Sequence, residues 1–379
     1  MKRALLTFAS ILLLCAALTA QTVCFDEVDT GTGPNPKRGV ILDSNGNGKL
    51  DLALIAGGTQ GYGIGIDSLL GNGDGSFSKL RAYHGPGLPT SLTTGDFNHD
   101  GKADVAISFD QTSNTTGIVA ILLGNGDGTF GSVHSMATAQ PANTIVAGDF
   151  NGDGKLDVAV TTGPYATSTA DIELLLGNGD GSLQSPTVLT TLPWYTTALS
   201  VADLNGDGKL DLVSDGGNTN DGGQIVTVLL GNGNGTFQTP ASYPGPLKVA
   251  QTIAIADFNG DGHPDVAVPS ISGISLFSGS GTGALTGPAS VSMSTDPLSL
   301  AAIDLFGNGA QSLVGSDGTG QNYIGIAIND GTGNFTSQSY KVAGPNYYVY
   351  PGDFNNDGKT DLLILYIDSS RVGVLLNCS

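Results

Sequence analysis

The sequence predicts an all-β fold, a seven-bladed β-propeller of four-stranded blades, from its composition, its internal repeat and the relation between its two ends. Of 379 residues, 58 are Gly and only 13% are charged. Turn and strand-edge residues are abundant, whereas Glu, Lys and Arg, which usually cover helix surfaces, are scarce. The composition therefore argues against helical bundles, and the formal net charge of −20 argues against a nucleic-acid partner.

The beginning of the chain has the pattern of a secretory signal peptide. A short positive segment, Lys2-Arg3, precedes a nearly unbroken apolar run that small residues end at Ala20. A run of about 15 apolar residues is shorter than the roughly 20 that a membrane span needs, so we expect cleavage rather than an anchor. Residues 1–20 are then the signal peptide. Residues 21–379 are the propeller, secreted or held at the cell surface, with the periplasm as an alternative compartment and with no membrane span in the mature chain.

A nine-residue pattern, D-x-N-x-D-G-x-x-D, recurs along the mature chain. Its seven copies start at Asp43, Asp96, Asp149, Asp203, Asp257, Asp304 and Asp353. Successive starts differ by 53, 53, 54, 54, 47 and 49 residues, a period typical of propeller blades. The first copy has Asn47 at position 5, and the sixth is degraded to D-L-F-G-N-G-A-Q-S.

Each repeat offers four strand-like segments separated by turn residues. In the third repeat we expect these strands at Thr144–Gly148, Val158–Thr162, Ile172–Leu176 and Pro186–Thr191. A second turn motif, G-N-G-D-G, lies between the third and fourth segments of the first three repeats, and the fourth repeat has the variant G-N-G-N-G. Four strands in each of seven units predict the propeller. A linear solenoid is the alternative, but it would need capping repeats that the sequence does not contain.

The two ends of the chain favour a closed ring. The seventh repeat stops after its third strand, and the run Thr22–Val28 is strand-like but has no partner in its own repeat. Pairing the two would complete the last blade and remove two exposed sheet edges. Cys24 and Cys378 lie on either side of this closure, so we expect them to form a disulfide in an oxidising compartment. Two free thiols are the alternative.

The nine-residue loops have the donor pattern of a calcium site. Side-chain oxygens stand at positions 1, 3, 5 and 9, the Gly at position 6 permits a sharp turn, and the carbonyl at position 7 can add a ligand. Hard oxygen donors favour Ca²⁺ over Zn²⁺. The alternative is an Asx-rich turn without metal.

We expect calcium in six loops and none in the sixth, where Phe306 and Ser312 occupy ligand positions. The expected ligands are Asp43, Asn45, Asn47, Lys49, Asp51, Asp96, Asn98, Asp100, Lys102, Asp104, Asp149, Asn151, Asp153, Lys155, Asp157, Asp203, Asn205, Asp207, Lys209, Asp211, Asp257, Asn259, Asp261, His263, Asp265, Asp353, Asn355, Asp357, Lys359 and Asp361. In this set the Lys and His residues contribute only their backbone carbonyls.

These repeats resemble those of the FG-GAP/VCBS family, which occurs in the integrin α-subunit head and in many bacterial secreted proteins. The resemblance covers residues 22–379, and the calcium loops are its most specific part. It implies a seven-bladed propeller with Ca²⁺ bound at positions 1, 3, 5, 7 and 9 of each loop. The chain departs from the family at Asn47, in the sixth loop and in the Gly-Ala-Pro signature, which is largely missing.

Aromatic residues favour the face opposite the calcium loops as a ligand-binding surface. Because blade strands are antiparallel, the loops between second and third strands and the connections between blades lie on that face. Our candidates there are Trp194, Tyr195, Tyr243 and Tyr347. Aromatic rings beside polar groups suit glycan or protein recognition, and packing between blades is the alternative role.

The sequence therefore predicts a monomeric, non-catalytic binding or adhesion module for an extracellular glycan or protein. It contains neither a G-x-S-x-G elbow nor an H-E-x-x-H motif. Two alternatives stay open. One is an extracellular polysaccharide lyase or hydrolase, because propellers also host enzymes, and the other is a purely structural envelope component.

Overall fold

The computed structural model describes residues 23–32, 36–56, 65–85, 87–110, 116–164, 169–217, 223–245, 248, 250–271, 273–366 and 369–379. The expected signal peptide lies outside these residues. The described ranges form 28 strands in seven four-stranded sheets and contain no helix. None of the described segments is therefore a helix that could cross a bilayer.

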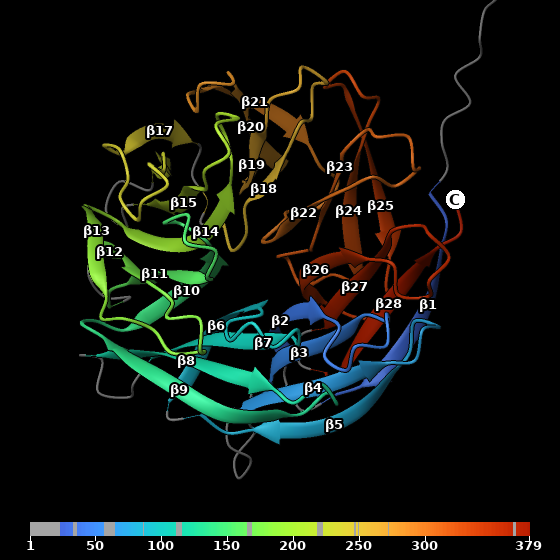
Figure 1. Ribbon diagram of the computed structural model, residues 1–379. Coiled ribbons are helices and arrows are strands. Elements are labelled where there is room, and N and C mark those ends of the chain that lie inside the picture. The colour runs from blue at the N-terminus through green and yellow to red at the C-terminus, as the bar shows by residue number, and fades with distance from the viewer. Residues whose placement is uncertain are drawn as a thin grey trace, which may run out of the picture.

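The seven sheets stand as blades around a central axis (Figure 1). Blade 1 contains β2 (Pro36–Leu42), β3 (Asp51–Ala56), β4 (Gly65–Gly71) and β5 (Phe77–Tyr83). Blade 2 contains β6 (Leu88–Gly95), β7 (Asp104–Asp110), β8 (Gly117–Gly124) and β9 (Phe130–Thr138). Blade 3 contains β10 (Ala142–Gly148), β11 (Asp157–Thr162), β12 (Ala170–Leu175) and β13 (Thr187–Leu192). Blade 4 contains β14 (Tyr195–Ala202), β15 (Asp211–Gly217), β16 (Gln224–Leu229) and β17 (Ala241–Gly245).

The remaining three blades follow the same order. Blade 5 contains β18 (Ala254–Ala256), β19 (Asp265–Ser270), β20 (Gly273–Gly279) and β21 (Leu285–Ser292). Blade 6 contains β22 (Leu300–Ile303), β23 (Ser312–Gly315), β24 (Tyr323–Asn329) and β25 (Phe335–Lys341). Blade 7 contains β26 (Asn346–Gly352), β27 (Asp361–Tyr366), β28 (Arg371–Asn377) and, as its outer strand, β1 (Phe25–Gly31). The predicted seven-bladed propeller is confirmed, and the four strands expected in the third repeat match β10 to β13 within two residues.

The hydrophobic core lies between the blades rather than within any one of them. Seven clusters of buried apolar side chains each join two adjacent blades, including the pair formed by the last blade and the first. The second strand of a blade has neighbours on both faces, so β3, β11 and β27 are buried along their whole length. Burial on both faces explains why these strands are nearly continuous apolar runs instead of alternating ones.

Hydroxyl groups tie successive inner strands together around the channel. Thr90 donates to the carbonyl of Ala142 at 2.8 Å, and Thr144 donates to the carbonyl of Thr197 at 3.1 Å. Two further bonds, Ser200 to Ile253 at 3.3 Å and Thr252 to Leu300 at 3.0 Å, continue the series to blade 6. These bonds satisfy inner-strand carbonyls that face the next blade instead of a neighbouring strand.

The ring closes as the sequence predicts. Strand β1 pairs antiparallel with β28, from Phe25 opposite Asn377 to Gly31 opposite Arg371, and the C-terminus lies beside β1 (Figure 1). Cys24 and Cys378 form a disulfide with their Cα atoms 5.2 Å apart, which confirms the predicted pairing. The first and last strands of the described residues therefore belong to one blade.

Candidate functional site

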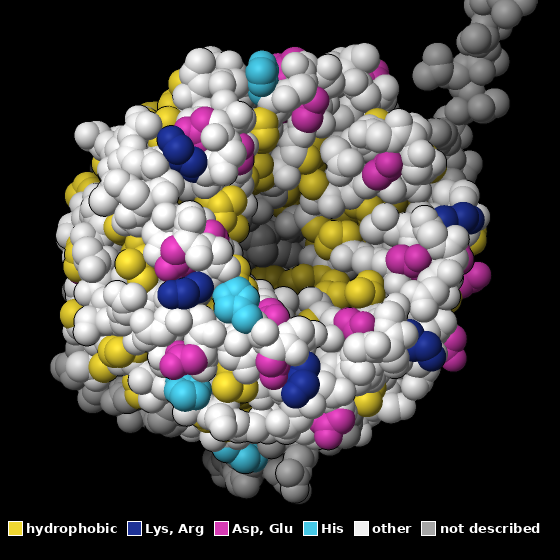
Figure 2. Space-filling view, viewed as in Figure 1, with side chains coloured by type: hydrophobic (Ala, Val, Ile, Leu, Met, Phe, Trp, Pro, Cys, Tyr) yellow, Lys and Arg dark blue, Asp and Glu magenta, His cyan; other side chains and the backbone are white. Residues whose placement is uncertain are grey.

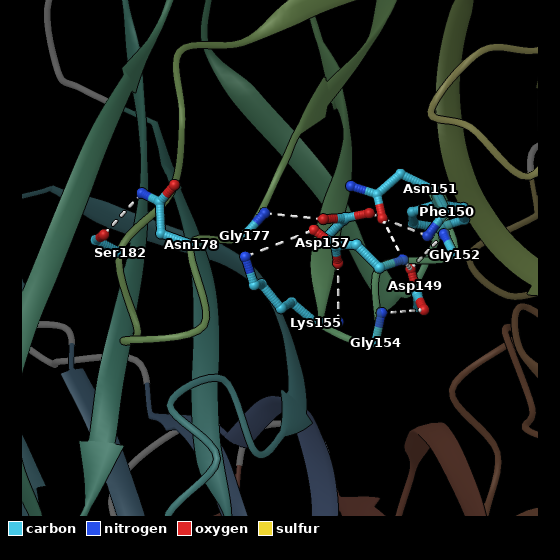
Figure 3. A network of polar contacts seen from close by, with 11 residues as sticks. Asp149, Phe150, Asn151, Gly152, Gly154, Lys155, Asp157, Gly177, Asn178 and Ser182 are labelled. Carbon is cyan, nitrogen blue, oxygen red and sulfur yellow. Dashed lines mark hydrogen bonds and ion pairs between the residues drawn. The ribbon is translucent and has the colours of Figure 1, made fainter.

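The nine-residue loops connect the first and second strands of each blade, and their acidic side chains turn inward to bind their own backbone. In the third loop Asp149 Oδ2 accepts the N–H of Gly154 at 2.8 Å, and Asn151 Oδ1 accepts that of Asp153 at 2.8 Å (Figure 3). Asp153 Oδ1 in turn accepts the N–H of Lys155 at 3.0 Å. Gly154 has a φ of 81°, so position 6 needs a residue that tolerates the left-handed region.

The same turn recurs in all seven loops, including the degraded sixth. The N–H at position 6 donates to the first Asp at 2.8 to 2.9 Å in every copy, and Gly309 makes this bond to Asp304. The loop conformation is therefore encoded by position 1 and by the turn at position 6. The residues at positions 3 and 9 of the sixth loop, Phe306 and Ser312, do not disturb it.

The Asp at position 9 has a structural role that sequence reasoning missed. Asp157 is fully buried, and its Oδ2 accepts the N–H of Phe150 at 3.0 Å while its Oδ1 accepts the N–H of Gly177 at 2.8 Å (Figure 3). The carboxylate thus joins the loop to the turn between the third and fourth strands. Equivalent pairs of bonds are made by Asp51, Asp104, Asp211, Asp265 and Asp361.

The turns between the third and fourth strands form hydrogen bonds to the neighbouring blade, a second role that the sequence did not reveal. The N–H of Gly181 in blade 3 donates at 3.0 Å to the carbonyl of Phe97, position 2 of the loop in blade 2. Corresponding bonds join Gly75 to Phe354, Gly128 to Ser44 and Gly235 to Phe150. In blades 6 and 7 an Asn side chain replaces the glycine N–H, Asn329 to Phe258 at 2.7 Å and Asn377 to Leu305 at 2.9 Å.

The second to fifth loops and the seventh each hold three Asp residues, whose carboxylates lie close enough to repel one another. Burial raises the pKa of Asp157, and the charges of Asp153 and Asp149 raise it further against the effect of its two N–H donors. The same causes raise the pKa at position 9 in four other loops, at Asp104, Asp211, Asp265 and Asp361. A cation placed among these groups would relieve the repulsion.

The donors in each loop are carboxylate, amide and carbonyl oxygens, a set whose chemistry fits a hard cation such as Ca²⁺. Lys155, the nearest basic side chain in the third loop, reaches Asp153 Oδ2 only at 3.7 Å. No three Asp, Glu, His or Cys side chains of the described residues group together as a metal site. Calcium at positions 1, 3, 5, 7 and 9 therefore stays a prediction.

The opposite face holds a cavity of about 330 Å³ at the mouth of the central channel, where the inner strands begin. We call this cavity the channel mouth. It is lined by side chains from blades 1 to 5 and 7, among them Arg38, Asn143, Thr196, Gln251 and Tyr347. On the face that Figure 2 draws, the centre of the ring is also hollowed, and hydrophobic side chains border the hollow.

Hydrogen bonds cross the channel mouth between blades that are distant in sequence. Arg38 Nε donates to the hydroxyl of Tyr348 at 2.8 Å, and Arg38 Nη1 donates to Ser91 Oγ at 3.1 Å. The Tyr348 hydroxyl donates in turn to the side-chain oxygen of Gln251. The Tyr348 ring stacks on that of Tyr350 with centroids 6.1 Å apart. One network therefore fixes the orientation of side chains from blades 1, 2, 5 and 7.

Of the four aromatic residues predicted to bind a ligand, the structure brings one to the channel mouth. Tyr347 lines the cavity and is 40% exposed. Trp194 is half-buried and packs against the core between blades 3 and 4, and Tyr243 packs against the core between blades 4 and 5. Tyr195 is half-buried at the start of β14. Arg38 and Asn143, which the sequence analysis did not single out, have no motif that marks them.

Comparisons with known proteins agree with the repeat and the ring. A sequence model of the FG-GAP-like repeat matches residues 43–107, 108–160, 165–214 and 216–268. No curated protein sequence matches the chain. Among 308 similar solved chains is that of an Agrocybe aegerita lectin, described in terms of its specific recognition of non-reducing terminal N-acetylglucosamine. The two chains share 18% identity and a TM-score of 0.55 over 91% of this chain and 96% of the lectin, so the likeness shows a shared fold.

Proposed function

The chain belongs to the FG-GAP-like repeat family, and from that membership we propose that it is a secreted, calcium-stabilised propeller that binds an extracellular glycan without catalysis. The observation that carries the proposal is the channel mouth, a cavity that combines an exposed tyrosine ring with amide and hydroxyl groups. Aromatic faces beside hydrogen-bonding groups match the apolar faces and hydroxyls of a sugar ring. The lectin that shares this fold is described by its specific recognition of non-reducing terminal N-acetylglucosamine, and this likeness supports the same class of ligand.

Secretion is supported by the chemistry of the closure. The Cys24–Cys378 disulfide is of a kind that persists in oxidising compartments and is rare in the cytosol. The N-terminal charge and apolar pattern of a signal peptide points to the same route.

The glycan proposal is tested on an array of extracellular glycans probed with calcium-saturated, labelled protein. We expect a restricted set of glycans to bind, and we expect Tyr347→Ala to reduce their signals about tenfold, because a stacked aromatic ring supplies much of a sugar's contact. Tyr243→Ala, which removes a tyrosine that packs between blades, is the control. Cleavage of a bound glycan would favour the enzyme alternative. An array without any specific signal would contradict the proposal and favour a structural envelope role.

Calcium is proposed as a structural ion in six loops. Positions 1, 3 and 5 would hold it through side-chain oxygens, position 7 through its carbonyl, and position 9 through the carboxylate that also bridges to the neighbouring turn. The ion would supply positive charge among carboxylates that otherwise repel one another. The sixth loop, with Phe306 and Ser312 at ligand positions, is proposed to hold none.

Removing calcium should lower the stability of the protein. Each occupied site contributes about 2.7 kcal/mol when free calcium exceeds its dissociation constant about a hundredfold, so excess EDTA should lower the melting temperature markedly. Calorimetric titration should find six ions per chain. Asp149→Asn keeps an oxygen acceptor for the turn but removes one charge, so it should bind one ion fewer.

Asp180→Asn is the matched control, because Asp180 lies in an exposed turn of the same blade, outside the nine-residue loop, and accepts hydrogen bonds from the N–H and the hydroxyl of Ser182. It should leave the calcium stoichiometry unchanged. A melting temperature that is the same with calcium and with EDTA would refute the structural role of the ion.

A further inference from the structure

We propose that the channel mouth binds a saccharide that carries a carboxylate, with Lys37 and Arg38 supplying the positive charge and Tyr347 the surface for the sugar ring. This inference rests on the proposed glycan-binding function and specifies the chemical class of its ligand. Three observations carry it: the distribution of charge, unpartnered polar atoms in the cavity wall, and an exposed tyrosine ring beside a fixed one.

Charge at the channel mouth is opposite in sign to that of the whole chain. The chain has only 14 Lys and Arg residues and a net charge of −20, yet two adjacent basic residues of β2 line this one cavity. None of the described residues that line it is Asp or Glu. A positively charged site in an acidic molecule attracts anions locally. Sites for neutral sugars can use carboxylates as acceptors for the sugar hydroxyls, and the described lining offers no such carboxylate.

The two basic side chains are suited to different tasks. Lys37 is exposed at the rim, where a flexible ammonium can meet an incoming carboxylate. Arg38 is half-buried, with its guanidinium 5.5 Å from the centroid of the Tyr348 ring and its hydrogen bonds directed to the hydroxyls of Tyr348 and Ser91. It is therefore held in one orientation before any ligand arrives, which reduces the entropy lost on binding.

Buried polar atoms in the cavity wall have no partner among the described residues. Asn143 is 7% exposed and Thr196 is 2% exposed, and neither Asn143 Oδ1 nor Thr196 Oγ1 has a hydrogen-bond partner. The other end of the Asn143 amide donates to the carbonyl of Gly163 at 3.0 Å, which fixes the side chain. Such atoms are costly to leave unpaired, and the two side chains that carry them line the cavity where the hydroxyls of a sugar would lie.

The aromatic surface favours a terminal sugar unit over a long chain. Tyr348 is buried and is fixed by Arg38 and Gln251, while Tyr347 beside it is exposed and free to contact a sugar ring. A cavity of about 330 Å³ is at the small end of ligand pockets. The carboxylate would lie toward Lys37 and Arg38, the ring toward Tyr347, and the hydroxyls toward Asn143 and Thr196.

The test compares acidic oligosaccharides with their uncharged counterparts. Oligosaccharides that end in galacturonic, glucuronic or N-acetylneuraminic acid are titrated calorimetrically into the calcium-saturated protein, each beside its methyl ester, which removes the charge and little else. We expect at least one acid to bind about tenfold more tightly than its ester, and this preference to shrink in 0.5 M salt.

Two variants and one control place the site. Lys37→Gln should cost the acid about tenfold in affinity and leave the ester unchanged, whereas Tyr347→Ala should weaken both. Lys341→Gln changes the net charge equally on an exposed strand of blade 6 and should have no effect. Lys37 lies at the opposite end of β2 from the first calcium loop, so its variant does not act through the ion.

The outcomes separate this inference from the function on which it rests. Equal binding of acid and ester, or equal effects of the two lysine variants, would overturn the inference while glycan binding stands. Binding of neutral array glycans without any of the acids would do the same. Binding of a peptide carboxyl terminus in place of every acidic sugar would overturn both, as would silence toward all saccharides.

Discussion

Replacing Asp215 by Asn should raise the free energy of unfolding at pH 7 by about 2–4 kcal/mol. Asp215 lies on β15 and is fully buried, one carboxylate oxygen accepts the N–H of Ala250 at 3.1 Å, and the side chain of Gln224 faces the carboxyl group. Burial raises the pKa of Asp215 to about 8, and its hydrogen bonds only partly oppose that shift. Asn retains an acceptor for Ala250 without a group that must be kept neutral.

The sign of the pH dependence follows from this raised pKa. The folded protein keeps the Asp215 proton up to about pH 8, whereas the unfolded chain releases it near the ordinary aspartate pKa of 3.8. The stability that this group contributes is therefore fully present below pH 4 and is lost as the pH rises from 4 to 8, by about 1.4 kcal/mol per pH unit.

Urea unfolding of calcium-saturated protein at pH 5.0 and 7.5 measures the effect. Asp215→Asn should stabilise the protein more at pH 7.5 than at pH 5.0. Asp180→Asn, an exposed Asp of blade 3 with a lowered pKa, should show no such increase. A variant that is less stable than the parent at pH 7.5 would mean that the buried carboxylate is ionised and balanced by a partner.

Replacing Cys24 and Cys378 together by Ser should lower the free energy of unfolding by up to about 5–6 kcal/mol. The disulfide joins residues 354 positions apart, so it removes much of the freedom of the unfolded chain. The fall is measured by urea unfolding, with the parent protein in reducing buffer as a second route to the same state.

Other contacts hold β1 in its blade after the disulfide is lost. Arg371 pairs with Asp29 at 2.7 Å, the Tyr340 hydroxyl donates to the carbonyl of Phe25 at 2.7 Å, and the Tyr366 hydroxyl donates to Glu27. The double variant should therefore keep the propeller fold but exchange the amide protons of β1 faster than those of β27. An unchanged unfolding midpoint would show that these contacts alone set the stability of the closure.

The sequence predicts those parts of the fold that are encoded locally and repeated. Asp149 and Gly154 fix a turn through hydrogen bonds within six residues. Because Asp at position 1 and Gly at position 6 recur in every repeat, the same loop forms seven times. The closing strand could also be predicted, because the last repeat has three strands and the run around Cys24 has no partner in its own repeat.

What the sequence could not reveal depends on contacts between blades. The N–H of Gly181 and the carbonyl of Phe97 are backbone groups, so no residue type indicates the hydrogen bond that they form between blades. Trp194 and Tyr347 have similar sequence contexts, and only the packing of blades buries the first and exposes the second. The channel mouth gathers residues about one repeat apart from several inner strands, and none of them belongs to a motif.

The pairing of β1 with β28 also determines when the molecule can finish folding. Strand β1 is synthesised before the other strands of the ring, but its partner β28 is synthesised after all of them. A growing chain can therefore assemble its middle blades while the seventh blade remains incomplete. Until then, the nascent protein presents an open arc with two sheet edges available to other chains. If translation stopped within the final repeat, β1 would have no partner strand and the ring would stay open, even if the preceding six blades had formed.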